Sequence, residues 1–230
     1  NTLFSNDCTH PLLVQAVTDS LQKAGIPAEH IIIYDRKTDE MERARYPVNS
    51  DKTGVQCYGT TFSQVYNIGG KDILLSDILH ECDALINIPI LTGITFFGAG
   101  ISFALKNHFG TFNKPREFHG EKFLQGVTEL NALPPIKNKT RLIIGDILKN
   151  KSYRSRHGRF VIGGKHILMS YDPVAIDTIG AHIAEEAYSI EGKETPVVIV
   201  QSNPWLIRAT ELGLGCSNLK EIDLIEKNKV

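Results

Sequence analysis

Two aspartates near residue 170 are the first side chains whose types and spacing could support chemistry. Asp172 stands directly before Pro173, an order typical of helix starts, where a carboxylate caps free backbone N–H groups. Asp177 follows on an otherwise apolar row of the same predicted helix, so its carboxylate needs a partner or faces a cleft. We therefore expect Asp172 to be a helix cap or a ligand-binding residue. Asp177 is expected to form a structural ion pair or to act as an acid–base group.

A lysine, an asparagine and a histidine stand together at the end of a helix predicted at residues 101–108. They are Lys106, Asn107 and His108, and Gly110 follows them as a helix terminator. A basic side chain at a helix C-terminus gains about 0.3–1 kcal/mol from the helix dipole when it is exposed. In the functional interpretation, Lys106 binds an anionic group and Asn107 donates a hydrogen bond to a polar group of the ligand. Both interpretations stay open.

Asp146 and His119 complete the set of candidate acid–base groups. Asp146 follows a strand predicted at residues 141–144, and the carboxyl ends of strands are where α/β proteins usually place ligand contacts. A turn-forming role for Asp146 is the alternative. His119 lies near a predicted helix end and is a reserve acid or base, since imidazole is the commonest catalytic proton carrier.

These residues lead to a functional hypothesis and two rivals. The first hypothesis is an enzyme, or a former enzyme, that handles a small anionic molecule in a cleft at the strand ends. Lys106 would bind the anion, Asn107 would orient it, and Asp177 or Asp146 would be the acid or base. The first rival is an exported, non-catalytic binding or redox-accessory protein, which predicts an exposed apolar patch. In the second rival, Asp177 and Lys106 form a purely structural ion pair.

Motifs for several other chemistries are absent from the sequence. Gly93, Gly98 and Gly100 have the wrong spacing for a dinucleotide-binding or phosphate-binding loop, so nucleotide binding is not expected. No local histidine pair indicates a metal site, and no Gly-x-Ser-x-Gly motif indicates a nucleophilic triad. The cysteines are too far apart for a zinc ribbon or an iron–sulfur cluster, and we expect free thiols. They are Cys8, Cys57, Cys82 and Cys216.

The composition excludes some classes of partner. The chain has 25 basic and 26 acidic side chains, so it lacks the overall positive charge of a nucleic-acid-binding protein. We therefore expect no nucleic-acid partner. No stretch approaches the roughly 20 apolar residues of a transmembrane helix, because the most apolar region, residues 86–105, is broken by proline and glycine.

The order of apolar patterns predicts an α/β fold with a mixed, largely parallel sheet flanked by helices. One domain spans residues 1–230, and a boundary between two lobes near residues 91–100 is an alternative. Buried-type strands are predicted at 30–34, 84–88, 141–144 and 197–200, a hairpin around 163–164, and a last strand at 219–225. Helices are predicted at 11–24, 38–45, 72–81, 101–108, 121–133, 173–188 and 204–212.

Several short motifs, taken in order, resemble the domain-of-unknown-function 362 family over nearly the whole chain. The opening helix motif is Thr9-His-Pro11, and the chain later reads Asn131-Ala-Leu-Pro134 and Gly213-Leu-Gly215. The other matching pieces are the residues 81–91, the Ala-Leu-Lys-Asn sequence at 104–107 and the Asp-Pro-Val-Ala-Ile-Asp sequence at 172–177. Each piece is short, and their order and spacing make the set fairly specific.

The resemblance implies little chemistry, because the family has no generally established reaction. Many members carry twin-arginine export signals, which implies an extracytoplasmic location, and the family's opening strand would place the true start upstream of Asn1. Other members carry ferredoxin-like cysteine clusters, and this chain has none. Members often place a lysine and a histidine where this chain reads Thr92-Gly-Ile94, so an activity that depends on them would be lost or altered here.

Overall fold

The computed structural model describes residues 8–94, 100–149, 151–155, 158–162, 164–190 and 203–227. Helices and short strands alternate within these residues, which confirms the predicted α/β class. The described strands form one three-stranded sheet and four two-stranded sheets. Two of the six described strand pairings are parallel and four are antiparallel. The orientation is therefore mixed, as expected, with a smaller parallel share than the largely parallel sheet that was predicted.

The three-stranded sheet is centred on β8 (Thr140–Ile147). On one side β5 (Leu85–Asn87) runs parallel to it, and on the other β11 (His166–Ser170) runs antiparallel. Gly145 lies in the middle of β8 beneath the ring of Phe103, and a Cβ atom there would come within 2.2 Å of the ring. Only glycine allows this close approach, so Phe103 can fill the core against the sheet.

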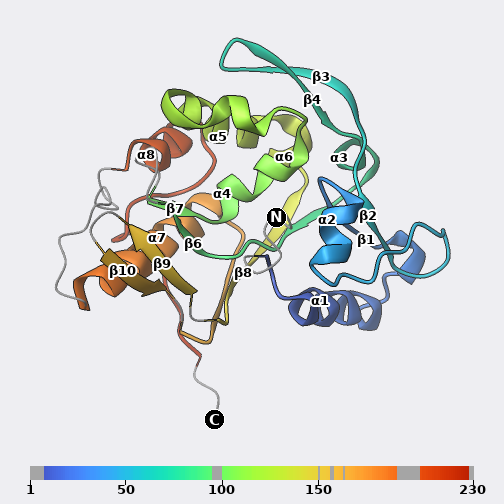
Figure 1. Cartoon of the computed structure of the whole chain (residues 1–230), viewed down its shortest axis with the longest axis horizontal. Helices are drawn as coiled ribbons and strands as arrows, with labels where there is room; N and C mark the ends of the chain where they lie inside the picture. The colour runs from blue at the N-terminus through green and yellow to red at the C-terminus, as the bar shows by residue number, and fades with distance from the viewer. Residues whose placement is uncertain are drawn as a thin grey trace.

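Several helices pack on the main hydrophobic core, and Figure 1 shows α4, α5 and α6 lying together with α7 and α8 beside them. They are α4 (Ala104–Asn107), α5 (Phe123–Ala132), α6 (Pro134–Lys137), α7 (Pro173–Ile190) and α8 (Pro204–Glu211). Short 3₁₀ turns link α4 to α5, namely η2 (His108–Thr111), η3 (Pro115–Phe118) and η4 (Gly120–Lys122). The largest buried side chains are aromatic, among them Trp205, Phe103 and Phe112. Their burial supplies much of the hydrophobic stabilisation of this region.

A second, smaller core joins the N-terminal elements. These are α1 (Pro11–Lys23), η1 (Ala28–His30), β1 (Ile32–Asp35), α2 (Thr38–Arg43) and β2 (Gln56–Gly59). β1 and β2 pair in parallel, and Val14, Met41 and Cys57 are buried between the elements. The sequence begins α1 with proline at the first helical position and ends it before Gly25, whose φ of 96° favours glycine.

The segment 72–81 was predicted as one helix, and this prediction was wrong for its first half. β4 (Lys71–Ser76) pairs there with β3 (Phe62–Ile68) in an antiparallel hairpin, and α3 (Asp77–Glu81) follows. Ile73 and Leu75 alternate into the core, with 1% and 0% of their surface exposed. Because alternate residues are buried, this segment forms a strand, although its short apolar run is equally compatible with a helix. Figure 1 shows the hairpin running along the edge of the molecule to α3.

Other predicted elements also need correction. The helix expected at 101–108 is shorter, because β7 (Gly100–Ser102) pairs with β6 (Thr92–Ile94) before α4 begins. The hairpin expected around 163–164 is wrong, since β10 (Gly158–Ile162) pairs with β9 (Lys151–Ser155), whereas β11 pairs with β8. No strand forms at 219–225. The strand expected at 197–200 and part of the glycine-rich run, 95–99, lie outside the described residues.

Two further expectations concern the cysteines and membrane spans. None of the four cysteines forms a disulfide bond among the described residues, as the sequence predicts. In the part of the chain that the structure describes, no helix combines the length and the apolarity that crossing a bilayer requires.

Candidate functional site

The carboxylate of Asp177 is buried in α7 and holds the start of α4. It is 0% exposed, and its two oxygens accept hydrogen bonds from the backbone N–H groups of Ala104 at 2.6 Å and Leu105 at 3.1 Å. The residue before α4, Phe103, offers no capping oxygen, so the cap comes from another helix. Burial raises the pKa of Asp177 to about 7, and the two backbone hydrogen bonds oppose this shift.

Asp172 is the N-cap of α7, as the structural interpretation of the sequence predicted. One of its oxygens accepts from the N–H groups of Val174 and Ala175, both at 2.8 Å. The other accepts from the N–H group of Cys216 at 2.8 Å. The carboxylate therefore caps a helix and ties the segment after α8 to it, and both of its oxygens are occupied.

Asp146, near the end of β8, also accepts hydrogen bonds from backbone N–H groups. Its side chain is 2% exposed and accepts hydrogen bonds from the N–H groups of His10 at 2.8 Å and Leu148 at 3.0 Å. It thereby fixes the start of α1 against the central sheet. All three candidate aspartates bind backbone N–H groups, which are the donors that must be satisfied when a chain end or a helix start is buried.

Lys106 and His119 both contact the buried ring of Phe109. The ammonium of Lys106 is 5.0 Å from the centroid of the ring, a cation–π contact. The ring of His119 meets Phe109 edge-on, with 5.4 Å between the centroids. Burial lowers the pKa of Lys106 to about 8. The pKa of His119 is lowered by the buried part of its ring and then by the Lys106 charge.

Asn107 belongs to a chain of hydrogen-bonded amides. Its Nδ2 donates to Oδ1 of Asn87 at 2.8 Å. Asn87 is 4% exposed, and its own Nδ2 donates to the carbonyl of Ala104 at 2.9 Å and lies 3.3 Å from Nε2 of His108. The Ala104 carbonyl can only accept, so the orientation of the Asn87 amide is fixed. Nε2 of His108 is then the acceptor, and the proton of its ring lies on Nδ1.

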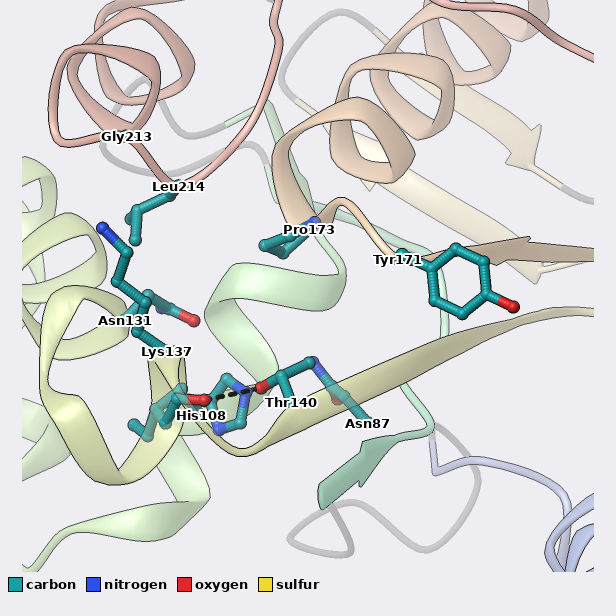
Figure 2. Close-up of a pocket in the computed structure, with 10 residues that line it drawn as sticks. Asn87, His108, Asn131, Lys137, Thr140, Tyr171, Pro173, Gly213 and Leu214 are labelled. Carbon is teal, nitrogen blue, oxygen red and sulfur yellow. Dashed lines mark hydrogen bonds between the residues drawn. The ribbon is translucent and has the colours of Figure 1, made fainter. Parts of the chain in front are cut away.

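A cavity of about 180 Å³ opens next to this chain of amides. Figure 2 shows its wall, which is built from the end of β5, the α4–η2 junction, α5, α6, the starts of β8 and α7, and the loop after α8. Its lining residues are Asn87, His108, Asn131, Ile136, Lys137, Thr140, Tyr171, Pro173, Gly213 and Leu214. The ring of Tyr171 points away from the others in Figure 2 and is 83% exposed.

The cavity wall carries an ammonium group and no carboxylate among these lining residues. Lys137 ends α6, and its Nζ donates to the carbonyl of Leu212 at 3.2 Å, which leaves further N–H groups for a ligand. His108 is 4% exposed, and burial lowers its pKa to about 4, so its ring is neutral near pH 7. Among the lining residues, Lys137 is therefore the side chain that carries a charge near pH 7.

Asn131 supplies an acceptor to the same space. Its Nδ2 donates to the carbonyls of Leu105 at 2.8 Å and Val127 at 2.7 Å. Its Oδ1 forms no hydrogen bond with any described residue, although the side chain is only 3% exposed. Because Asn131 lines the cavity, this oxygen is available to accept a hydrogen bond from a ligand.

None of the six residues that the sequence analysis proposed as catalytic or ligand-binding lines the cavity. Asn107 contacts its wall through Asn87, and Asp172 stands between Tyr171 and Pro173. Asp177 and Lys106 form no ion pair with each other, since both oxygens of Asp177 accept backbone hydrogen bonds. Among the described residues, no group of three or more histidine, cysteine or acidic side chains is placed to hold a metal ion.

The lining residues that sequence reasoning missed are Asn87, Asn131, Lys137 and Thr140, together with a cavity role for His108. Asn87 and Asn131 lie in elements that were predicted, and both are polar at otherwise apolar positions. That is the same signal that drew attention to Asp177, and it applies equally to any polar side chain on a buried face.

A comparison with known families decides the relationship of the chain. The family described as Domain of unknown function (DUF362) matches residues 4–182. The chain belongs to the DUF362 family. The matched region contains most of the cavity wall, and Gly213 and Leu214 lie beyond it. The family description assigns no reaction to DUF362 proteins. No curated protein and no solved structure matches the chain.

Proposed function

We propose that this DUF362 protein binds a small anionic molecule in the cavity at the carboxyl end of β5. The observation that carries the proposal is the polar wall of the cavity, which contains the Lys137 ammonium and no carboxylate. An anion there is attracted by Lys137 and meets no like charge among the lining residues. The volume of about 180 Å³ is below the roughly 300–1,000 Å³ of sites for drug-sized ligands, so the ligand has few heavy atoms.

The two other polar groups of the wall define what the ligand carries besides its charge. Nδ1–H of His108 is a donor, and Oδ1 of Asn131 is an acceptor with no other described partner. A hydroxyl group satisfies both, because it donates and accepts at once. A small hydroxycarboxylate therefore matches the wall, with its carboxylate at Lys137 and its hydroxyl between His108 and Asn131.

Binding is better supported than acid–base catalysis. Asp177 and Asp146, the two aspartates considered as acids or bases, each have both oxygens engaged by backbone N–H groups. His108 has a pKa lowered to about 4, which makes it a weak base at pH 7. Its neutral ring is suited to donate a hydrogen bond to a ligand oxygen, and this orients the ligand without transferring a proton.

The test measures binding of glycolate, lactate, glycerate and inorganic phosphate by calorimetry, with thermal shift as a second readout. We expect at least one hydroxycarboxylate to bind, and Lys137→Met to weaken it by about tenfold or more, or about 1.4 kcal/mol. Lys137→Arg keeps the charge and should retain most of the affinity. Lys52→Met removes an exposed lysine outside the cavity wall and should change nothing.

Two outcomes contradict the proposal. The first is equal affinity of the wild-type protein and Lys137→Met for a ligand that binds, because the anion would then lie elsewhere. The second is a wild-type protein to which none of the four probes binds at millimolar concentration. Binding of phosphate without any hydroxycarboxylate would retain the anion site and reject the assigned roles of His108 and Asn131.

A further inference from the structure

A second lysine, Lys106, lies outside the lining of the cavity and packs against the protein core. Its side chain is half-buried, and its ammonium rests on the face of Phe109, a core residue that is 4% exposed. Among the described residues, Nζ forms no hydrogen bond and no ion pair. The charged form of an amine that loses water contacts without gaining an acceptor or a counter-ion is destabilised.

We propose that Lys106 is a nucleophilic amine that forms an imine with small aldehydes or ketones. Lysines that are desolvated and lack a counter-ion are the ones that proteins use to form Schiff bases. Burial of the side chain against the Phe109 ring lowers the pKa of Lys106 to about 8. His119, whose pKa responds to the Lys106 charge, lies close enough to sense the protonation state of the amine.

The reaction is balanced without an oxidant or a reductant. The lone pair of the neutral amine forms a C–N bond with the carbonyl carbon, and a proton moves from nitrogen to the former carbonyl oxygen. Loss of water from this adduct leaves the C=N bond. At pH 7 about one amine in ten is neutral for a pKa near 8, against about one in 2,500 for an ordinary lysine. The more acidic amine is intrinsically less nucleophilic, which offsets part of this gain.

The experiment traps the imine in the wild-type protein. Glyoxylate and sodium cyanoborohydride convert each imine to a stable secondary amine, and peptide mass mapping measures the rate at every lysine. We expect Lys106 to react about tenfold or more faster than exposed Lys52 at pH 7, and its rate to level off above about pH 8. Greater exposure cannot cause this result, because Lys106 is the more buried of the two.

Labelling of Lys106 that is equal to or slower than that of Lys52 overturns the proposal. So does a rate at Lys106 that keeps rising up to pH 10, because its amine would then be protonated at neutral pH. Lys137→Met separates this inference from the proposed function. That variant should lose binding in the cavity and keep the Lys106 labelling rate, so either proposal can fail while the other holds.

Discussion

Two lysines stand in equivalent positions, each in the last turn of a four-residue helix, and their surroundings differ completely. Lys137 of α6 is exposed and donates to the carbonyl of Leu212. Lys106 of α4 is half-buried over Phe109, and its pKa is lowered to about 8. The helix dipole favours a cation at both places. The difference teaches that burial and hydrogen-bond acceptors, and not position along a helix, decide how far the pKa of a lysine is lowered.

Among the variants that test this comparison, Asp177→Ala should cause the largest loss of stability. The change leaves the N–H groups of Ala104 and Leu105 buried without an acceptor and removes the cap that positions α4 and Lys106. We expect the free energy of unfolding to fall by about 2–4 kcal/mol, measured by urea denaturation. Asp172→Ala, which removes the cap of α7 and leaves the two hydrogen bonds of Asp177 to α4 in place, is the comparison variant. A loss below about 0.5 kcal/mol for Asp177→Ala would show that α4 does not depend on its carboxylate.

Gly215→Ala should instead disturb the cavity wall that contains Lys137. A Cβ atom at residue 215 would lie 1.8 Å from Oδ1 of Asp172, so the loop that follows α8 must move. This loop includes Gly213 and Leu214 of the cavity wall. We expect a loss of stability of about 2 kcal/mol in thermal unfolding and weaker ligand binding, with the Lys106 labelling rate unchanged. Gly54→Ala is the comparison variant: Gly54 also has a positive φ, 78°, but a Cβ atom there meets no atom within 4 Å, so its loss of stability reports backbone strain without a clash.

The pH dependence of stability should reveal the lowered pKa of Lys106. The pKa of Lys106 is lowered from 10.5 to about 8 in the folded protein, so the unfolded chain binds more protons between these values. Stability contributed by this group therefore rises with pH from about 8 to 10.5. Compared with Lys106→Met, the wild-type protein should gain about 1–2 kcal/mol across this range in urea titrations, allowing for partial solvation. A constant difference between the two proteins would contradict a lowered pKa.

The smallest effect should come from Lys137→Met in the absence of ligand. Its exposed ammonium makes one hydrogen bond, to Leu212, so the free energy of unfolding should change by less than about 0.5 kcal/mol. Denaturation at pH 7 measures this. A large loss would mean that Lys137 stabilises the fold, and the binding experiment with this variant would then need Lys137→Gln as a second test.

Local patterns predicted much of the fold. Proline at a first helical position located the starts of α1, α7 and α8, because its fixed φ and missing N–H suit that position. Asp172 was identified as a helix cap for the same kind of local reason. An apolar run that is compatible with both a strand and a helix was assigned to a helix at residues 72–76, where the structure has a strand. The partner of β10 could not be predicted, since strand pairing is decided by contacts between distant segments.

The candidate site was less predictable than the fold. Asp177 was singled out correctly as a buried polar residue that needs partners, yet those partners are backbone N–H groups 72 and 73 residues away. Asn131 carries the same signal, and sequence alone cannot tell which of the two has an oxygen left for a ligand. That distinction requires the hydrogen bonds of each atom, which only a three-dimensional arrangement specifies.

The capping of α4 by Asp177 has a consequence for the order in which the protein is assembled. A helix of four residues is too short to persist alone, because nucleating a turn costs more than its few bonds return. During synthesis, the segment that carries Lys106 and His108 therefore cannot be capped until Asp177, more than seventy residues later in the chain, has been made. Both chemical features proposed for this protein should thus emerge together, and only after α7 has left the ribosome and docked.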